Sequence, residues 1–304
     1  MAKLFPPPFP WFGGKSRAAE LVWSRFGNIE HYIEPFAGSL AVLLNKPKNV
    51  ICRVTVNDLD GFIANFWRAA ANTPEQVAHY ADWPVNETDL HARHKWLVNR
   101  QAFRRRLLDD PHYYDAKIAG WWVWGIALWI GAGWCDPNSL GGKRPHLSGS
   151  GQGVHRKTGE KRVDLLAPRR VGRVSVPVNA YMYSLSLRLR RTRVCCGDWG
   201  RILTPNVTSN LSGIMLDPPY TSEVRGMGIY RKDHPSIAKD VVKWAIANGE
   251  RTNLRIAVCG LQGEHEFPPN WKCERWAAPQ GYTKGPANKE VIWFSPHCLQ
   301  PGLW

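Results

Sequence analysis

The chain has 304 residues, of which 44% are hydrophobic, and it carries a formal net charge of +15 at pH 7 with a pI of about 9.7. This length and apolar content suffice for one large domain or two modest ones. A basic excess of this size favours a nucleic acid as partner, because a protein that neutralises phosphates releases counterions. An anionic membrane surface is the competing partner. No apolar run is long enough to span a bilayer, so we expect no membrane protein.

Seven cysteines are scattered along the chain, and none forms a C-x-x-C pair. Their odd number and irregular spacing indicate neither a disulfide framework nor a zinc site. We therefore expect reduced thiols in a cytoplasmic protein without a structural metal. No basic-plus-apolar leader precedes the first predicted elements, which agrees with that location.

The N-terminal segment carries two glycines and a lysine immediately before a helix that we predict from Ser16 to Phe26. Glycines 13 and 14 allow the backbone to approach a ligand closely. Lys15 would then lie near a helix N-terminus, which is a natural anion site. The alternative is a plain glycine turn with a solvated lysine, and this segment alone favours that alternative.

The next stretch, residues 31–44, predicts a strand, a tight turn and a helix, and Val50–Val56 predicts a second strand. Only Gly38 occupies the turn, so the dinucleotide fingerprint is absent and phosphate binding is not implied. The first ~70 residues therefore resemble half of a doubly wound, nucleoside-binding sheet.

An acidic residue, Asp58, follows the second predicted strand. It lies about two dozen residues after Glu34, where folds of this kind place an acid on ribose hydroxyls. The alternative is that Asp58 caps the helix predicted over Leu59–Ala71. Both interpretations stay open at this point.

Composition changes after Thr73-Pro74, where residues 75–118 become polar and helical, and basic residues outnumber acidic ones from Arg93 to Arg193. We interpret residues 75–178 as an inserted, DNA-facing region. The alternative is a helical subdomain with solvated charged faces. The basic side chains expected to contact DNA are Arg93, Lys95, Arg104, Arg105, Arg106, Lys143, Arg144, Arg156 and Lys157.

Strands and helices alternate again after the insertion, which predicts an α/β fold whose sheet is split between residues 1–74 and 179–304. Asp198 follows one of these strands and stands beside Trp199. The predicted helices are Asn179–Leu189 and Pro235–Asn248, and the predicted strands are Thr192–Cys196, Leu211–Leu216, Leu254–Cys259 and Val291–Ser295.

The stretch Asp217-Pro218-Pro219-Tyr220 follows the apolar run Ile214–Leu216. Two prolines end a strand, because they donate no ladder hydrogen bonds, and they stiffen the turn that follows. Open α/β sheets bind ligands at this end of their strands. Asp217 and the Pro218 carbonyl can accept the two hydrogens of an exocyclic amine while Tyr220 stacks on the ring. An ordinary strand-to-loop exit is the alternative.

Taken in order, these motifs resemble the Dam-like (D12 class, alpha arrangement) DNA adenine-N6 methyltransferases. The resemblance covers the two ends of the chain and implies a Rossmann-like sheet that binds S-adenosylmethionine. The middle departs from the family, with Gly120–Gly125 and Gly131–Cys135 in place of its aromatic-glycine-arginine pattern. This departure resembles a phage and prophage branch. The matching motifs are Trp11–Lys15, Glu34–Gly38, Asn57-Asp58, Gly197-Asp198-Trp199, Asp217–Tyr220 and Glu290–Pro296.

The resemblance implies a role for each matching residue. Trp11 and Lys15 would contact the methionine end of the cofactor, Asp58 its ribose and Asp198 its adenine amine. The target adenine would lie against Asp217, Pro218, Pro219 and Tyr220. Glu34, Phe36, Ala37, Gly38 and Trp199 complete the expected cofactor site. The expected partner is double-stranded DNA in a prokaryotic or phage-infected cell, bound by a protein that can act as a monomer.

Two other functions remain open. One is another amino-methyltransferase, acting on cytosine N4, RNA adenine or a protein amide, although an aspartate at position 217 favours adenine. The other is a non-catalytic DNA-binding protein on the same fold. Because a sulfonium methyl group is already activated, the predicted reaction needs no metal. Its target base must leave the duplex to be reached.

Overall fold

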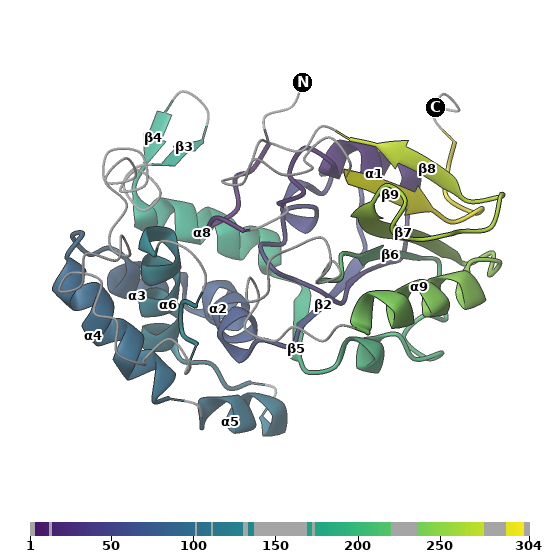
Figure 1. Cartoon of the computed structure of the whole chain (residues 1–304). Coiled ribbons are helices and arrows are strands. Elements are labelled where there is room, and N and C mark those ends of the chain that lie inside the picture. The colour runs from purple at the N-terminus through teal and green to yellow at the C-terminus, as the bar shows by residue number, and fades with distance from the viewer. Residues whose placement is uncertain are drawn as a thin grey trace.

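The computed structural model describes residues 4–11, 14–100, 102–110, 112–129, 133–136, 169–171, 174–219, 236–276 and 290–300. Its central element is a seven-stranded sheet with the order β5-β2-β1-β6-β7-β9-β8 (Figure 1). The strands are β1 (His31–Glu34), β2 (Arg53–Asp58), β5 (Thr192–Cys196), β6 (Ser212–Leu216), β7 (Leu254–Leu261), β8 (Lys272–Arg275) and β9 (Glu290–Phe294). A separate hairpin joins β3 (Arg169–Val171) to β4 (Val174–Val176).

Five neighbouring strands of the sheet, from β5 to β7, run parallel, and β9 is antiparallel to β7 and β8. The strand order reverses at β1, which pairs with β2 on one side and with β6 on the other. Such a switch point leaves a crevice at the carboxyl ends of the strands, where ligands bind in doubly wound folds. Since β9 runs the other way, its first residue, Glu290, lies at that same edge, paired with Leu261.

Both faces of the sheet are covered, because successive side chains of its central strands enter different cores. Tyr32 and Met215 belong to one core with the N-terminal helices. Ile33, Ile214 and Leu216 belong to the other, against α9. The helices are α1 (Ala19–Phe26), α2 (Gly61–Asn72), α3 (Pro74–Ala81), α4 (Glu87–Val98), α5 (Phe103–Asp109), α6 (Ala116–Leu128), α8 (Val178–Leu189) and α9 (Ile237–Asn248).

The helices α3 to α6, which the sequence predicts as part of an insertion, share the first of these cores. Trp122 of α6 meets Phe9 edge-on at 4.9 Å between ring centroids, and both side chains are buried. The helices α3 to α6 lie together at one end of the molecule, away from β8 and β9 (Figure 1). None of the helices in the described part of the chain combines the length and apolar character that a membrane span needs.

The α/β class is confirmed, and the predicted strands and helices lie within a few residues of the observed ones. The stretch after Gly38 forms only a short 3-10 turn, Leu43–Asn45, instead of the expected helix. The suggestion that Asp58 caps the next helix is wrong, because α2 begins at Gly61 and its cap is Asp60, whose side chain accepts from the Phe62 N–H. Three strands were not predicted: β3, β4 and β8.

Candidate active site

Three strand exits at the carboxyl edge are fastened to one another through Asn57, a buried residue near the end of β2. Its amide donates to the Pro35 carbonyl at 3.1 Å and to the Gly197 carbonyl at 2.9 Å. The backbone carbonyl of Asn57 accepts from the Ala37 N–H at 2.8 Å. The loops after β1, β2 and β5 therefore hold a fixed relative position, which a multipoint ligand site requires.

Gly38 stands where the backbone passes directly beneath the Trp11 indole. Its φ is +43°, and a Cβ added there would lie 2.5 Å from Trp11 Nε1. The Gly38 carbonyl also accepts from the indole of Trp67 at 2.9 Å. A side chain at this position would be strained by the backbone and would displace Trp11, so glycine is required.

Two carboxylates lie on the β1–β2 side of the crevice. Asp58 accepts from the Gly38 N–H at 3.0 Å and from the Asp60 N–H at 2.8 Å. Burial raises the pKa of Asp58 to about 7 even though these hydrogen bonds lower it. Burial also raises the pKa of Glu34 well above its ordinary value, with the charge of Asp217 adding to the rise while a 2.8 Å hydrogen bond from the Tyr32 hydroxyl opposes it.

The β5 exit places a carboxylate beside an aromatic wall. Asp198 is exposed and caps a short 3-10 turn, Trp199–Ile202, by accepting from the Gly200 N–H at 2.9 Å. The rings of Trp199 and Phe36 stack with their centroids 6.1 Å apart and their planes 26° apart. A flat apolar wall next to an acceptor suits a planar, amine-bearing ring.

Lys15 lies at the centre of the edge, buried to 4% exposure. Its ammonium is 3.1 Å from Asp217 Oδ1 and 3.5 Å from Glu290 Oε2, and 5.5 Å from the centre of the Trp276 ring. The N-terminal motif, the β6 exit and the start of β9 thus meet at one cation. The predicted site did not include Glu290, because only the antiparallel direction of β9 brings that residue to this edge.

The turn after β6 begins as predicted, with Asp217 half-exposed, Pro218 buried and Pro219 half-buried. Each of these three residues lacks regular secondary structure, as two consecutive prolines require. Tyr220 lies outside the described residues, as do Lys143, Arg144, Arg156 and Lys157.

The structure does not support Arg93 as a DNA contact. This side chain of α4 is 6% exposed, and its guanidinium lies 4.3 to 4.9 Å from the ring centroids of Trp83, Trp121 and Trp124. Burial also lowers the pKa of Arg93. Its charge is stabilised by the faces of the three indole rings, so it packs the helical region instead of reaching phosphate.

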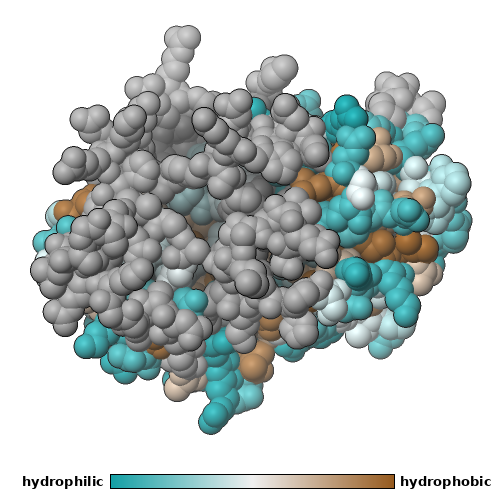
Figure 2. All heavy atoms as spheres, in the orientation of Figure 1, coloured by the Kyte–Doolittle hydropathy of each residue, from teal (hydrophilic) through white to brown (hydrophobic). Residues whose placement is uncertain are grey.

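The remaining described basic candidates differ in exposure. Lys95, Arg105 and Arg106 are exposed, and Arg106 lies 4.2 Å from the centre of the Tyr113 ring. Arg104 is half-buried and donates to the Leu59 carbonyl at 3.1 Å, so it fastens α5 to the start of α2. On the face shown in Figure 2, the coloured residues are mostly hydrophilic, with smaller hydrophobic patches between them.

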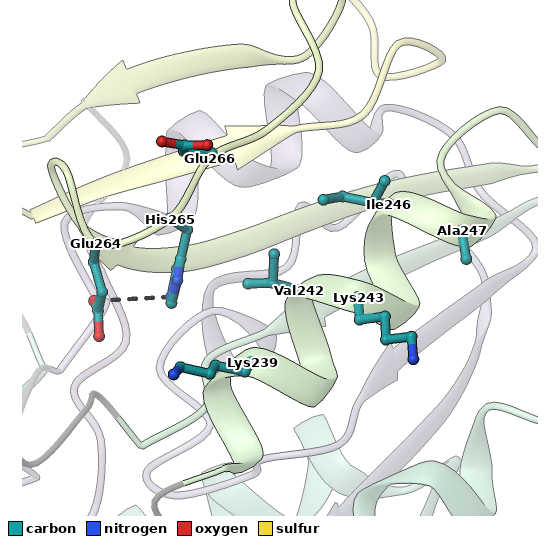
Figure 3. A pocket seen from close by; sticks show the side chains of 8 residues that line it. All are labelled: Lys239, Val242, Lys243, Ile246, Ala247, Glu264, His265 and Glu266. Atoms are coloured by element: carbon teal, nitrogen blue, oxygen red, sulfur yellow. Dashed lines mark ion pairs between the residues drawn. The ribbon is translucent and has the colours of Figure 1, made fainter.

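A separate hollow of about 640 Å³ lies between α9 and the turn that follows β7 (Figure 3). Its lining includes two lysines of α9, Lys239 and Lys243, and two glutamates of the segment after β7, Glu264 and Glu266. His265 lies between them, 3.9 Å from the Glu264 carboxylate. The lining therefore carries charges of both signs, and none of the predicted site residues lines this hollow.

Comparison with known families agrees with the geometry of the edge. Residues 11–115 match the family model of the D12 class N6 adenine-specific DNA methyltransferases. The chain carries a D12 class N6 adenine-specific DNA methyltransferase domain. Methyltransferases of this class transfer a methyl group from S-adenosylmethionine to the N6 amine of adenine in DNA. No curated protein matches the chain.

The family match covers only part of the candidate site. It includes Lys15, Glu34 and Asp58 and ends before Asp198 and Asp217. The sheet joins the two sets, since β6 pairs with β1 and β5 pairs with β2. Strand pairing therefore brings residues beyond the matched segment to the same edge.

Proposed function

We propose that the target adenine binds at Asp217, Pro218, Pro219 and Tyr220, and that S-adenosylmethionine lies across the switch point between β1 and β6. The ion pair between Lys15 and Asp217, at 3.1 Å, is the observation that carries this assignment. It joins a residue expected to bind the cofactor to a residue expected to bind the base. Methyl transfer requires the two ligands to meet at such a junction.

The residues at the edge fit the cofactor that the family uses. Asp58 and Asp198 supply acceptors for ribose hydroxyls and an adenine amine, and the Phe36–Trp199 pair supplies an aromatic wall. Both Asp58 oxygens already accept one N–H each, and an ionised carboxylate has about four acceptor positions. The cofactor supplies a methyl group activated by a positively charged sulfur, which an acid-rich site attracts. Trp11, Lys15, Glu34, Ala37 and Gly38 complete the proposed cofactor site.

Asp217 would act on the target nitrogen directly. The lone pair of the adenine amine is delocalised into the ring, which makes the amine a poor nucleophile. Hydrogen bonds from its two hydrogens to Asp217 and to the Pro218 carbonyl favour a tetrahedral nitrogen and stabilise the positive charge that develops on it. The new N–C bond would form as the S–C bond breaks, which leaves S-adenosylhomocysteine, and the nitrogen would then release one proton to water. Tyr220 stacking helps to offset the few kcal/mol that base flipping costs.

The insertion, residues 75–178, would bind the DNA. We propose a double-stranded substrate, a cytoplasmic location and a protein able to act as a monomer. Exposed Lys95, Arg105 and Arg106 support phosphate contacts, whereas buried Arg93 is left out. Division of the chain into a catalytic part (1–74 and 179–304) and this insertion is part of the proposal. Binding of phosphates would make DNA affinity depend on salt.

Asp217→Ala tests the central assignment. The variant is expected to lose methyl transfer by at least about a thousandfold, because the acceptor for the amine is gone. Binding of S-adenosylmethionine, measured by calorimetry, should change less than about threefold. Radiolabelled methyl transfer to DNA and long-read sequencing of that DNA measure the rate and the modified base. Wild-type turnover by Asp217→Ala would remove this carboxylate from the mechanism.

A further inference from the structure

Glu290 enters the site because of the direction of its strand. It is the first residue of β9, pairs with Leu261 at the end of β7 and is 9% exposed. Its Oε2 atom lies 3.5 Å from the Lys15 ammonium, on which Asp217 also converges. The carboxylate of Asp217, just after β6, and that of Glu290, at the start of β9, therefore both contact the buried ammonium of Lys15.

The charges of these three groups determine what Asp217 can do. Lys15 alone would neutralise the carboxylate it contacts, and the pair would present a net charge of about zero to the target amine. With Glu290 as a second partner, the three groups keep a net charge of about −1. Burial makes this difference matter, since water screens charges poorly in an enclosed site.

The reaction depends on that remaining negative charge. Positive charge moves from the donor sulfur to the target nitrogen as the N–C bond forms, and a carboxylate beside the nitrogen stabilises it. A cation 3.1 Å from Asp217 opposes this stabilisation unless another group offsets it. We infer that Glu290 is a positioning residue that holds Lys15 and offsets its charge, so that Asp217 remains an effective anion for the adenine amine. The inference rests on the proposed role of Asp217.

Single-turnover methyl transfer at saturating S-adenosylmethionine tests this role. Glu290→Gln is expected to slow the transfer at least about tenfold, with the Kd for S-adenosylmethionine changed less than about threefold. Adding Lys15→Met to this variant should then raise the rate above that of Glu290→Gln alone, because removing the cation restores the net charge. If the two substitutions acted only by disturbing packing, their losses of rate would instead add, and the double variant would be slower than either single variant.

A control removes a carboxylate from another ion pair whose cation is buried, although this carboxylate is itself partly exposed. Glu274 of β8 pairs with Arg25 of α1 and is not among the site residues. Glu274→Gln should keep the single-turnover rate, whatever it does to the melting temperature. If Glu290→Gln does not fold, Glu290→Asp carries the test, with a loss of about threefold expected because its shorter carboxylate offsets Lys15 less well.

Three results would overturn the inference. They are an unchanged rate in Glu290→Gln, a double variant slower than Glu290→Gln alone, or a loss above about a hundredfold in Glu290→Asp. The Asp217→Ala measurement separates these results from failure of the proposed function. Methyl transfer that persists without Asp217 would refute the base site itself, whereas the Glu290 results apply when Asp217→Ala is inactive.

Discussion

Asp58 is held at the end of β2 by two backbone N–H groups, and burial raises its pKa from 3.8 to about 7. In the proposed site a ribose hydroxyl donates to the ionised carboxylate, and protonation of the carboxyl removes this charged acceptor. If S-adenosylmethionine binds only to the ionised form of Asp58, its binding below pH 7 must release the proton that this carboxyl holds. The Kd for S-adenosylmethionine is expected to rise as the pH falls from 8 to 6, by up to about tenfold per pH unit below the pKa.

Calorimetry at pH 6, 7 and 8, in buffers of different ionisation enthalpy, measures both the Kd and the proton released. Asp58→Asn should bind weakly and lose the proton release that is specific to the wild type. Asp60→Asn is the matched control, because asparagine still caps α2 and the cofactor-facing carboxylate remains. Equal pH dependence in the wild type and Asp58→Asn would contradict the assignment.

At single positions, the sequence located the acids that follow parallel strands and misjudged residues whose surroundings are set by distant contacts. Asp58, Asp198 and Asp217 were predicted because a strand signal precedes each of them. Arg93 looked like part of a basic surface, although Trp83, from the segment before α4, and two tryptophans of α6 enclose its guanidinium. Glu290 was overlooked as a site residue because only its antiparallel pairing with the distant strand β7 brings it to this edge.

Among the elements, the strand-to-turn unit after β1 makes the most specific demand on sequence. Gly38 combines a φ of +43° with a Cβ position 2.5 Å from Trp11 Nε1, whereas Gly263 has a φ of +83° and an open surrounding. Gly263→Ala should therefore cost about 1 kcal/mol of folding free energy from backbone strain alone. Gly38→Ala should cost about 2–4 kcal/mol and weaken cofactor binding, because Trp11 must also move.

Urea unfolding of the two alanine variants measures the free-energy difference, and calorimetry measures the cofactor Kd. The comparison removes the common cost of replacing a positive-φ glycine. Equal destabilisation of the two variants, with an unchanged Kd in Gly38→Ala, would show that the approach of Trp11 to this turn is unimportant.

Elements with a clear apolar pattern were predicted, and those without one were not. In the middle of the sheet, Ile214 and Met215 of β6 pair with Ile256 and Ala257 of β7. All four side chains are buried and apolar, so both strands were recognisable from the sequence. The edge strand β8, Lys272–Arg275, is mostly exposed and polar, and its strand state comes from pairing with β9. The hairpin of β3 and β4 lies in a basic stretch without periodicity.

For the whole molecule, the helices of the proposed insertion share a core with the seven-stranded sheet instead of standing apart. Trp122 of α6 meets Phe9, and α2 donates Trp67 Nε1–H to the Gly38 carbonyl of the site. Phe9 also lies 5.8 Å from the Trp67 ring, so α6 of the proposed insertion contacts the turn after β1 indirectly, through Phe9 and α2. A substrate held by the insertion would consequently lie in a defined position relative to Asp217, which base flipping into a fixed pocket requires.

The net charge of +15 gives the last prediction, which concerns DNA affinity as a function of salt. Arg105 and Arg106 are exposed on α5, whereas neighbouring Arg104 is engaged with Leu59 and should be left intact. If both exposed arginines contact phosphate, Arg105→Gln/Arg106→Gln should flatten the slope of log K against log salt by about 1.8, or 0.9 per contact.

Fluorescence anisotropy with duplex DNA, at salt concentrations from about 50 to about 200 mM, measures the affinity and therefore this slope. Lys239→Gln/Lys243→Gln removes the same charge from α9 and serves as the matched control, since these exposed lysines line a hollow together with Glu264 and Glu266. The control should keep the wild-type slope. Because net charge falls equally in both variants, only a local phosphate contact makes the slopes differ. Identical slopes would identify the arginines of α5 as a solvated face.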